Sequence, residues 1–182
     1  NFLLTDGFSD LSGDLLPGTY SVAELPEEGW DLTSATCDDG SDPSSISLQS
    51  DEDVVCTFTN TQRGHIIIQK NAINDSDQEF TFNNDFDNGN PSTFGLTDDD
   101  TVGLPSYDAE VLPGTYAVSE DPITGWQQES VTCDNDETIG SIDVAAGETV
   151  TCTFTNEELA TIVLIKNTVG GDGTFDFDAT GA

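Results

Sequence analysis

Cysteine is the residue type whose spacing points most directly to chemistry in this chain. Cys37 and Cys56 are separated by the same interval as Cys133 and Cys152, and the chain has 4 cysteines in all. Equal pairs of this kind in small β-rich units are typical of disulfide bonds, which form outside the cytosol. We therefore predict two disulfides, each closing a loop of about 20 residues and contributing about 3 kcal/mol. Zinc is the alternative, but neither pair has a further cysteine or a histidine nearby.

Lysine is the second residue type of interest, because the chain has so few cations. It has 3 Lys and Arg residues against 36 Asp and Glu residues, which gives a formal net charge of −33. Its two lysines, Lys70 and Lys166, occupy equivalent positions in the similar segments 65–71 and 161–167. A chain that avoids cations but keeps one at the same place twice is expected to use it. The simpler alternatives are an ion pair with a nearby glutamate and an exposed surface lysine.

Aspartate is the third, because it gathers in segments that read as turns. Calcium takes six to eight oxygen ligands, and flexible acidic turns supply them. We expect at least one bound calcium, with ligands drawn from Asp38, Asp39, Asp75, Asp77, Asp85, Asp87, Asp98, Asp99, Asp100 and Asp172. Two alternatives stay open: an acidic surface adapted to high salt, and a solvated face in which Asp only serves as a good turn former.

The charge also limits the classes of partner. A surface this acidic repels both nucleic acid and anionic membranes, so we expect neither as a partner. No stretch of the sequence is apolar and long enough for a membrane-spanning helix, so we expect no direct insertion into a membrane.

The elements that must position these residues come from a repeated pattern. Pro17–Tyr20 recurs as Pro113–Tyr116 and Phe58–Asn60 recurs as Phe154–Asn156, at an offset of 96 residues in both cases. A fixed period this long indicates repeated domains. The front of the second copy, residues 65–71, is missing from the first copy and returns only near the C-terminus.

We therefore predict an all-β chain of tandem domains. Apolar residues alternate at period two in 19–23 and 150–155, as they do in half-buried strands, and no helical period is sustained. The first domain lacks its first strands, the second is complete, and the last segment supplies first strands to the next domain. The predicted domains are 1–60, 64–156 and 160–182, joined by linkers at 61–63 and 157–159.

The order of the motifs resembles that of the prealbumin-like domains, of Cna B or SpaA type, in bacterial and archaeal surface adhesins and pilin shafts. The first strand carries Ile66–Lys70, a middle strand carries Leu112–Glu120, and the last strand carries Thr151–Asn156. The first repeat matches at Leu16–Glu24 and Phe58–Asn60. The resemblance implies prealbumin-like (Ig-like) β-sandwich domains arranged head to tail. The cysteine pairs depart from the usual pilin pattern.

The resemblance also implies a role for the lysines. In that family a first-strand lysine can bond covalently to a last-strand asparagine, beside an acidic residue. A buried lysine loses its charge, and the neutral amine is a nucleophile that a neighbouring carboxylic acid can assist. The matching positions form two sets, namely Lys70, Glu120 and Asn156, and Lys166, Glu24 and Asn60.

These observations predict a structural repeat unit of an extracellular filament or adhesin stalk. We expect it to polymerise head to tail with identical subunits or repeats and to be stabilised by calcium. The sequence leaves open whether one chain runs through many periods or separate subunits meet end to end. The alternative function is a cell-surface adhesin module that binds a ligand through loops at one end of the sandwich, such as 83–93. An enzyme is not expected, because the chain has 1 histidine and no activated nucleophile pattern.

Overall fold

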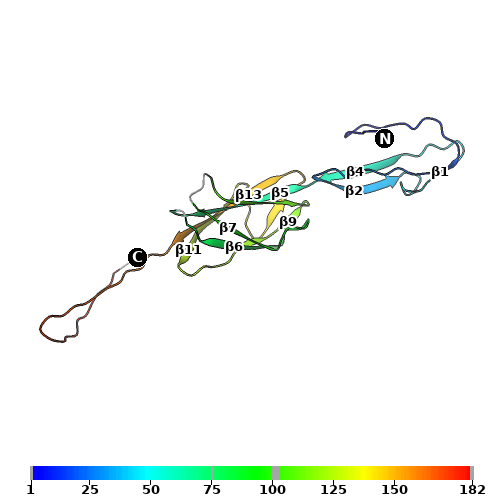
Figure 1. Ribbon diagram of the computed structural model, residues 1–182. Helices are drawn as coiled ribbons and strands as arrows, with labels where there is room; N and C mark the ends of the chain where they lie inside the picture. Colours follow the sequence, from blue (N-terminus) through cyan, green and yellow to red (C-terminus); the bar gives the residue numbers. More distant parts are fainter. Residues whose placement is uncertain (1, 75, 100–102, 181–182) are drawn as a thin grey trace.

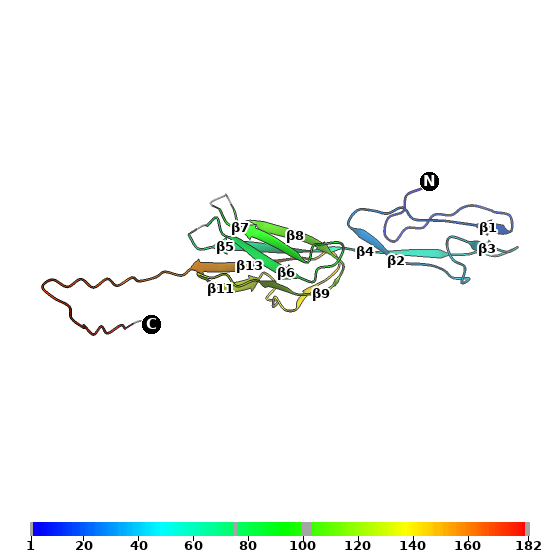
Figure 2. The ribbon, with the colours of Figure 1, turned by 60° about the horizontal axis from the view of Figure 1, so that its bottom comes forward.

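The computed structural model describes residues 2–74, 76–99 and 103–180, and all regular secondary structure in these ranges is β-strand. Figures 1 and 2 show an elongated molecule with a thin N-terminal unit, a central sandwich and an extended C-terminal tail. The predicted all-β class is confirmed. No helix suited to crossing a membrane occurs within the described ranges. The strands are β1 (Gly18–Tyr20), β2 (Trp30–Cys37), β3 (Ile46–Leu48), β4 (Cys56–Gln62), β5 (Gly64–Ala72), β6 (Glu79–Asn84), β7 (Thr93–Thr97), β8 (Ser106–Val111), β9 (Gly114–Tyr116), β10 (Val118–Glu120), β11 (Trp126–Cys133), β12 (Ile142–Val144) and β13 (Thr149–Glu158).

The central sandwich has two main sheets and one short ribbon. One sheet has the strand order β11-β13-β5-β8, the other has the order β10-β6-β7, and β12 pairs with β9. The first strand of the sandwich, β5, lies parallel to the last strand, β13, with Lys70 opposite Phe154 and Ala72 opposite Asn156. The two ends of the sandwich sequence therefore meet in the middle of one sheet.

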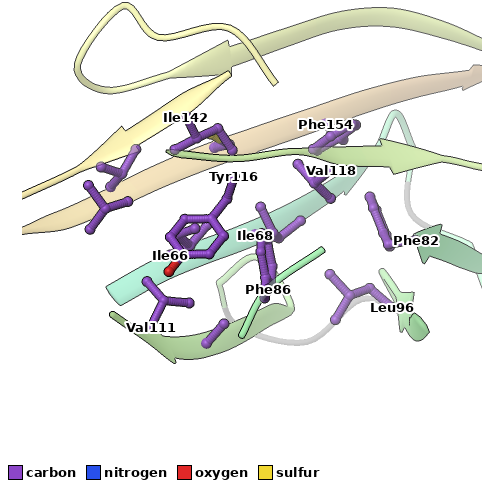
Figure 3. Packing of buried hydrophobic residues seen from close by; sticks show 14 of the residues in the cluster. Ile66, Ile68, Phe82, Phe86, Leu96, Val111, Tyr116, Val118, Ile142 and Phe154 are labelled. Atoms are coloured by element: carbon purple, nitrogen blue, oxygen red, sulfur yellow. The ribbon is translucent and has the colours of Figure 1, made fainter. Parts of the chain in front are cut away.

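The core lies between these two sheets because the strands alternate as the sequence predicts. Ile66 and Ile68 of β5 are fully buried, and so are Phe82 of β6 and Phe154 of β13. Figure 3 shows these side chains converging from both sheets. The rings of Phe82 and Phe154 meet edge to face, with their centroids 5.1 Å apart. Burial of this apolar surface is the main favourable term that holds the sandwich together.

The N-terminal unit repeats the sequence pattern without the core. In the part of the chain that the structure describes, it has only two ribbons, β1 with β3 and β2 with β4. Phe58, which is equivalent to the fully buried Phe154, is only half-buried, and Leu32 is 49% exposed. No counterpart of β5 lies beside β4 among the described residues, so one edge of β4 has no strand partner there.

Strand pairing continues into the segments that were predicted as linkers. β4 runs to Gln62, which pairs with Trp30, and β5 begins at Gly64, so only Arg63 lies between the two units. A Cβ at Gly64 would collide with Val144, and glycine lets the strand begin this close to the sandwich. At the second position β13 likewise runs to Glu158, beyond the boundary predicted at 156.

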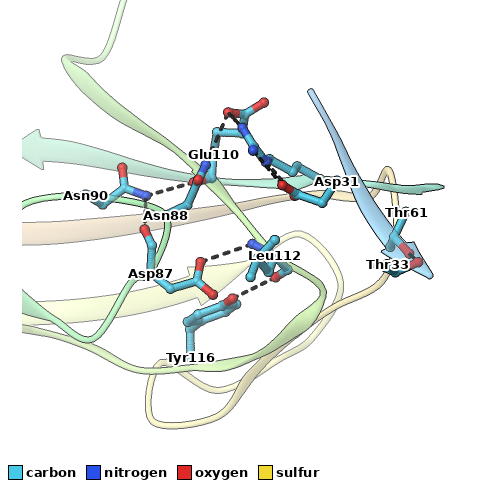
Figure 4. A network of polar contacts seen from close by, with 10 residues as sticks. Asp31, Thr33, Thr61, Asp87, Asn88, Asn90, Glu110, Leu112 and Tyr116 are labelled. Atoms are coloured by element: carbon cyan, nitrogen blue, oxygen red, sulfur yellow. Dashed lines mark hydrogen bonds and ion pairs between the residues drawn. The ribbon is translucent and has the colours of Figure 1, made fainter. Parts of the chain in front are cut away.

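Arg63 joins the N-terminal unit to the sandwich. Its guanidinium donates two hydrogen bonds of 2.7 Å to Asp31 of β2 and one of 3.1 Å to Glu110 of β8. Figure 4 shows this contact together with Asn88, whose side chain also donates to Glu110. The hydrogen bonds from Arg63 lower the pKa of Asp31, while those carboxylates raise the pKa of Arg63. A bidentate arginine–carboxylate pair fixes geometry as well as charge, so this contact orients the two units.

The sequence equivalent of Arg63 at the other end of the sandwich is Leu159. Its backbone N–H donates to Gly125 O at 2.7 Å, just as that of Arg63 donates to Gly29 O at 2.9 Å. The backbone path is therefore the same at both positions, but only the first carries an ionic contact.

We predict that Arg63→Leu, which installs the residue found at position 159, widens the range of orientations between the two units. The reason is that Asp31 and Glu110 lose their shared cation. Distances between spin labels on the two units should become more broadly distributed, while near-ultraviolet circular dichroism of the sandwich stays unchanged. Raising the salt should broaden the distances in the original protein and not in the variant. Identical distance distributions in the two proteins at low salt would contradict this role.

Both predicted disulfides are formed. Cys37 bonds to Cys56 and Cys133 to Cys152, and in each case the two residues are direct partners in the strand register. The second bond ties β11 to β13, the last strand of the sandwich. The disulfides therefore staple each hairpin that precedes a junction.

Candidate functional site

Lys70 is fully buried in the middle of the sandwich. The alternation of β5 turns its side chain inward with Ile66 and Ile68, and β5 is covered on both sides by β13 and β8. The Lys70 Nζ atom lies 3.4 Å from the carbonyl oxygen of Phe154 and 4.0 Å from the centre of the Phe80 ring. Nζ also lies 3.3 Å from the carbonyl oxygen of Asn71, so an ammonium group here would have only long contacts for its three donors.

Glu120 faces Lys70 from the opposite sheet. It lies at the end of β10, where it pairs with Phe82 of β6. Its Oε1 atom is 3.4 Å from Lys70 Nζ, and its side chain is only 3% exposed. The same Oε1 atom has no hydrogen-bond partner. A buried pair of charges this far apart recovers little of the cost of removing both from water.

Asn156 completes the site from β13. Its backbone carbonyl accepts a hydrogen bond of 2.8 Å from Ile73, and its side chain points inward on the face that also carries Lys70. Lys70 pairs with Phe154, so Asn156 is its diagonal neighbour two residues further along β13. The Oδ1 atom of Asn156 is buried without a partner. Two orphaned acceptors, on Glu120 and Asn156, thus surround one buried amine.

The surroundings of Lys70 disfavour the charged form of its amine relative to an amine in water. Desolvation lowers the pKa of Lys70, and the charges of Glu120 and Asp98 oppose this effect only in part. A proton that moves from Nζ to the Glu120 carboxylate leaves a neutral amine beside a carboxylic acid. This is the pairing that nucleophilic attack on an amide requires, with the acid able to polarise the amide oxygen.

The predicted amide bond between Lys70 and Asn156 stays a prediction, and its formation would take the following course. Lys70 Nζ would attack the side-chain carbonyl carbon of Asn156, a carbon–nitrogen bond would form, and the bond from that carbon to Nδ2 would break. Nδ2 would leave as ammonia, with protons from Nζ passed on through Glu120. The product would be a Lys70–Asn156 crosslink between the first and last strands. In the product, the unpaired acceptor atoms of Glu120 and Asn156 would either gain a hydrogen-bond partner or no longer require one.

Asp98 belongs to this neighbourhood, although the sequence suggested it as a metal ligand. It is only 3% exposed, and its Oδ2 atom accepts a hydrogen bond of 2.8 Å from the backbone of Ala72, two residues after Lys70. The spacing of Asp98 in the sequence could have indicated that its side chain points inward. Asp98 follows Phe94 and Leu96 at intervals of two, which continues the inward face of β7.

Comparison with known families agrees with this geometry. A family model described as a prealbumin-like fold domain, of SpaA type, matches residues 66–158, which is more than half of the chain. The chain belongs to this family. The SpaA-type match begins in β5 and ends in β13, so it covers the sandwich and all three residues of the buried site.

Two solved structures resemble this SpaA-type chain. One is the major pilin protein T3.2 of Streptococcus pyogenes serotype GAS13637, with 17% identity and a TM-score of 0.38, covering 78% of this chain and 68% of that one. The other is a major pilin from Streptococcus pyogenes, with 14% identity and a TM-score of 0.33, covering 80% and 72%. A comparison with curated proteins gives no match. The assignment rests on the family match, to which likenesses this distant add nothing.

The second predicted set is not assembled within the SpaA-type chain. The Asn60 side chain donates a hydrogen bond of 2.6 Å to Glu24, so two of its three members meet in the N-terminal unit. Lys166 lies far away on the exposed tail, where its Nζ atom donates to the Asn167 carbonyl at 2.7 Å and sits over the Phe175 ring. The first set is thus brought together, and the second is divided between the two ends of the molecule (Figure 1).

The proposed calcium ligands are scattered. Asp75 and Asp100 lie outside the described residues, and within the remainder no three His, Cys, Asp or Glu side chains group around a common point. Several of them accept backbone hydrogen bonds instead: Asp38 from Val55, Asp85 from Ala117, and Asp87 from Leu112 (Figure 4). These bonds account for their place in turns, and calcium binding stays a prediction.

We predict that the intact protein, denatured and reduced, is lighter than its sequence mass by one ammonia. Glu120→Gln should abolish this loss, because Lys70 and Asn156 remain but the carboxyl group is gone. The variant should also unfold more easily by about 3–5 kcal/mol, since it lacks the covalent link between the first and last strands. Mass spectrometry of both proteins measures the first effect, and denaturant unfolding measures the second.

Glu129→Gln is the matched control, because Glu129 is exposed on β11. It should keep both the ammonia loss and the stability of the original protein. A full sequence mass in the original protein would overturn the crosslink.

Proposed function

We propose that this chain is a structural repeat unit of an extracellular filament or adhesin stalk, in which β-sandwich units follow one another head to tail. The observation that carries the proposal is the buried set of Lys70, Glu120 and Asn156. It sits between β5, through which the chain enters the sandwich, and β13, through which the chain leaves. A crosslink at this place serves a unit that must transmit load along its chain.

Three further features support a load-bearing role. The sandwich belongs to the SpaA-type prealbumin-like family, and a single residue, Arg63, separates it from the preceding unit. Each unit carries a disulfide, which is typical of material outside the cytosol. Short junctions and covalent staples both reduce the freedom of a chain to extend or bend.

The loop at 83–93, which the alternative function would use for a ligand, gives less support to a binding module. Asn90 donates hydrogen bonds to the carbonyls of Asp87 and Glu110 (Figure 4). It also accepts one from the Tyr107 hydroxyl. The polar side chains of this loop are thus engaged in holding the loop itself. A structural role accounts for these contacts without a further partner.

Pulling single molecules from their two ends tests the proposal. In the original protein the Lys70–Asn156 crosslink should prevent the sandwich from contributing the length of 71–155 when it is stretched. Glu120→Gln should release that length because the crosslink is absent, apart from 134–151, which the Cys133–Cys152 disulfide keeps closed. Glu129→Gln should behave as the original protein does. Equal extension of the sandwich in all three proteins would contradict a crosslinked load-bearing unit.

Calcium is a further part of the proposal, and its support is the net charge of −33. Carboxylates crowded on one surface repel one another, and bound cations relieve that repulsion. Calcium added to the protein stripped with EDTA should raise its melting temperature more than magnesium does, measured by scanning calorimetry. Sodium chloride at matched ionic strength is the control. Equal effects of calcium and matched salt would assign the acidic surface to salt adaptation.

A further inference from the structure

The N-terminal unit offers an unpaired edge with the apolar residues of a core around it. In the described structure β4 is bonded on one side only, to β2. Leu25 is 77% exposed and Val55 is 61% exposed, and both lie in the unit that β4 belongs to. In the sandwich the corresponding strand, β13, is covered on that edge by β5. What covers such an edge in the complete unit is therefore a strand like β5.

The tail carries a strand of that kind without a sheet. Its residues Ile162, Val163, Leu164 and Ile165 are between 73% and 90% exposed, and no strand partner for them occurs among the described residues. They repeat the sequence of β5, in which Ile66 and Ile68 are fully buried. The molecule thus exposes both a strand that lacks a sheet and a sheet edge that lacks a strand.

We propose that residues 161–167 of one copy pair in parallel with β4 of a second copy and complete its N-terminal unit. The inference deepens the proposed head-to-tail assembly and rests on it for that direction of growth. The pairing of β5 with β13, shifted by the 96-residue offset, sets the register: Cys56 opposite Leu164, and Phe58 opposite Lys166. Backbone hydrogen bonds would supply affinity, and the alternate inward side chains would supply specificity.

The register turns the correct side chains inward. In β5 the inward residues are Ile66, Ile68 and Lys70, so the donated strand directs Ile162, Leu164 and Lys166 into the unit. Phe175 and Phe177 follow one residue sooner after Lys166 than Phe80 and Phe82 follow Lys70, and they keep the same interval of two. Phe82 faces β5 from the opposite sheet of the sandwich. The tail therefore holds apolar side chains for both sides of the missing core.

Charge complementarity also favours the tail strand of another copy as the partner of the N-terminal unit. A hollow of the N-terminal unit is lined by Glu24, Glu27 and Glu28, and by Asn60, which already donates to Glu24. Asp31 also lines it, but Arg63, a further lining residue, already holds that carboxylate. In the register above, Lys166 stands to Glu24 and Asn60 as Lys70 stands to Glu120 and Asn156. Lys166 is one of only 3 cationic Lys and Arg residues in the chain, so this acidic hollow meets the one lysine that is exposed.

The tail does not reach the N-terminal unit of its own copy. Figures 1 and 2 place the tail and the N-terminal unit at opposite ends of the molecule, with the whole sandwich between them. The donor surface and the acceptor surface are different, so each copy can accept at one end and donate at the other. A head-to-tail contact of this type grows into a filament when the rotation between successive copies does not close a ring.

The test compares the size of the full chain at increasing concentration with that of two tail variants, by light scattering after size-exclusion chromatography. The original protein should form assemblies that grow with concentration. Leu164→Asn should lower the association constant at least tenfold, because it places a polar side chain inward. Ile165→Asn is the matched control, since the equivalent Gln69 faces outward and is polar, and it should assemble as the original does.

A synthetic peptide of residues 160–178 supplies a second measurement. It should bind the Leu164→Asn protein, whose acceptor edge is intact, and it should shorten the assemblies of the original protein. A protein that stays monomeric at every concentration, or equal loss of assembly in both variants, would overturn the strand donation. The mass of the monomer shows whether the Lys70–Asn156 crosslink has formed. Absence of the crosslink would contradict the proposed function, but it would not change the outcome of the strand-donation test.

Discussion

The parallel contact between β5 and β13 is the constraint on which the rest of the structure depends. It joins the first and last strands of the sandwich in the middle of one sheet, and it closes the core around Ile66, Ile68 and Phe154. It also brings Lys70 and Asn156 onto one inward face, opposite Glu120. Without this pairing there is neither a core nor a buried amine, because both consist of residues more than 80 positions apart along the chain.

The N-terminal unit shows what the same pattern becomes when that contact is missing. Its hairpin of β2 and β4 keeps the register, the bulge and the disulfide of β11 and β13. Hydrogen bonds and a covalent staple are thus enough to hold a ribbon. They are not enough to bury Leu32 or Trp30, which stay 49% and 41% exposed. The hydrophobic core is a property of the assembled sheets, and local strand pairing alone does not create it.

Much of the fold and site could be predicted from the sequence because period and spacing carry them. Alternation at period two gave the strands, equal intervals gave the disulfides, and the resemblance placed Lys70, Glu120 and Asn156 at one site. Contacts that depend on distant neighbours could not be predicted. Arg63 was taken as linker, since its partners Asp31 and Glu110 belong to different units. Asp98 was taken as a surface turn residue, since its burial depends on how the end of β7 meets β5.

The few cations of this chain are nearly all withdrawn from solvent. Lys70 is fully buried, and the Arg63 side chain is 23% exposed and held by two carboxylates. Lys166 alone is freely exposed, and strand donation would enclose it as well. Digestive enzymes of the trypsin class cut after lysine and arginine, and they need an accessible, extended chain around that residue. A surface built from such units would therefore offer these proteases almost no accessible cleavage site.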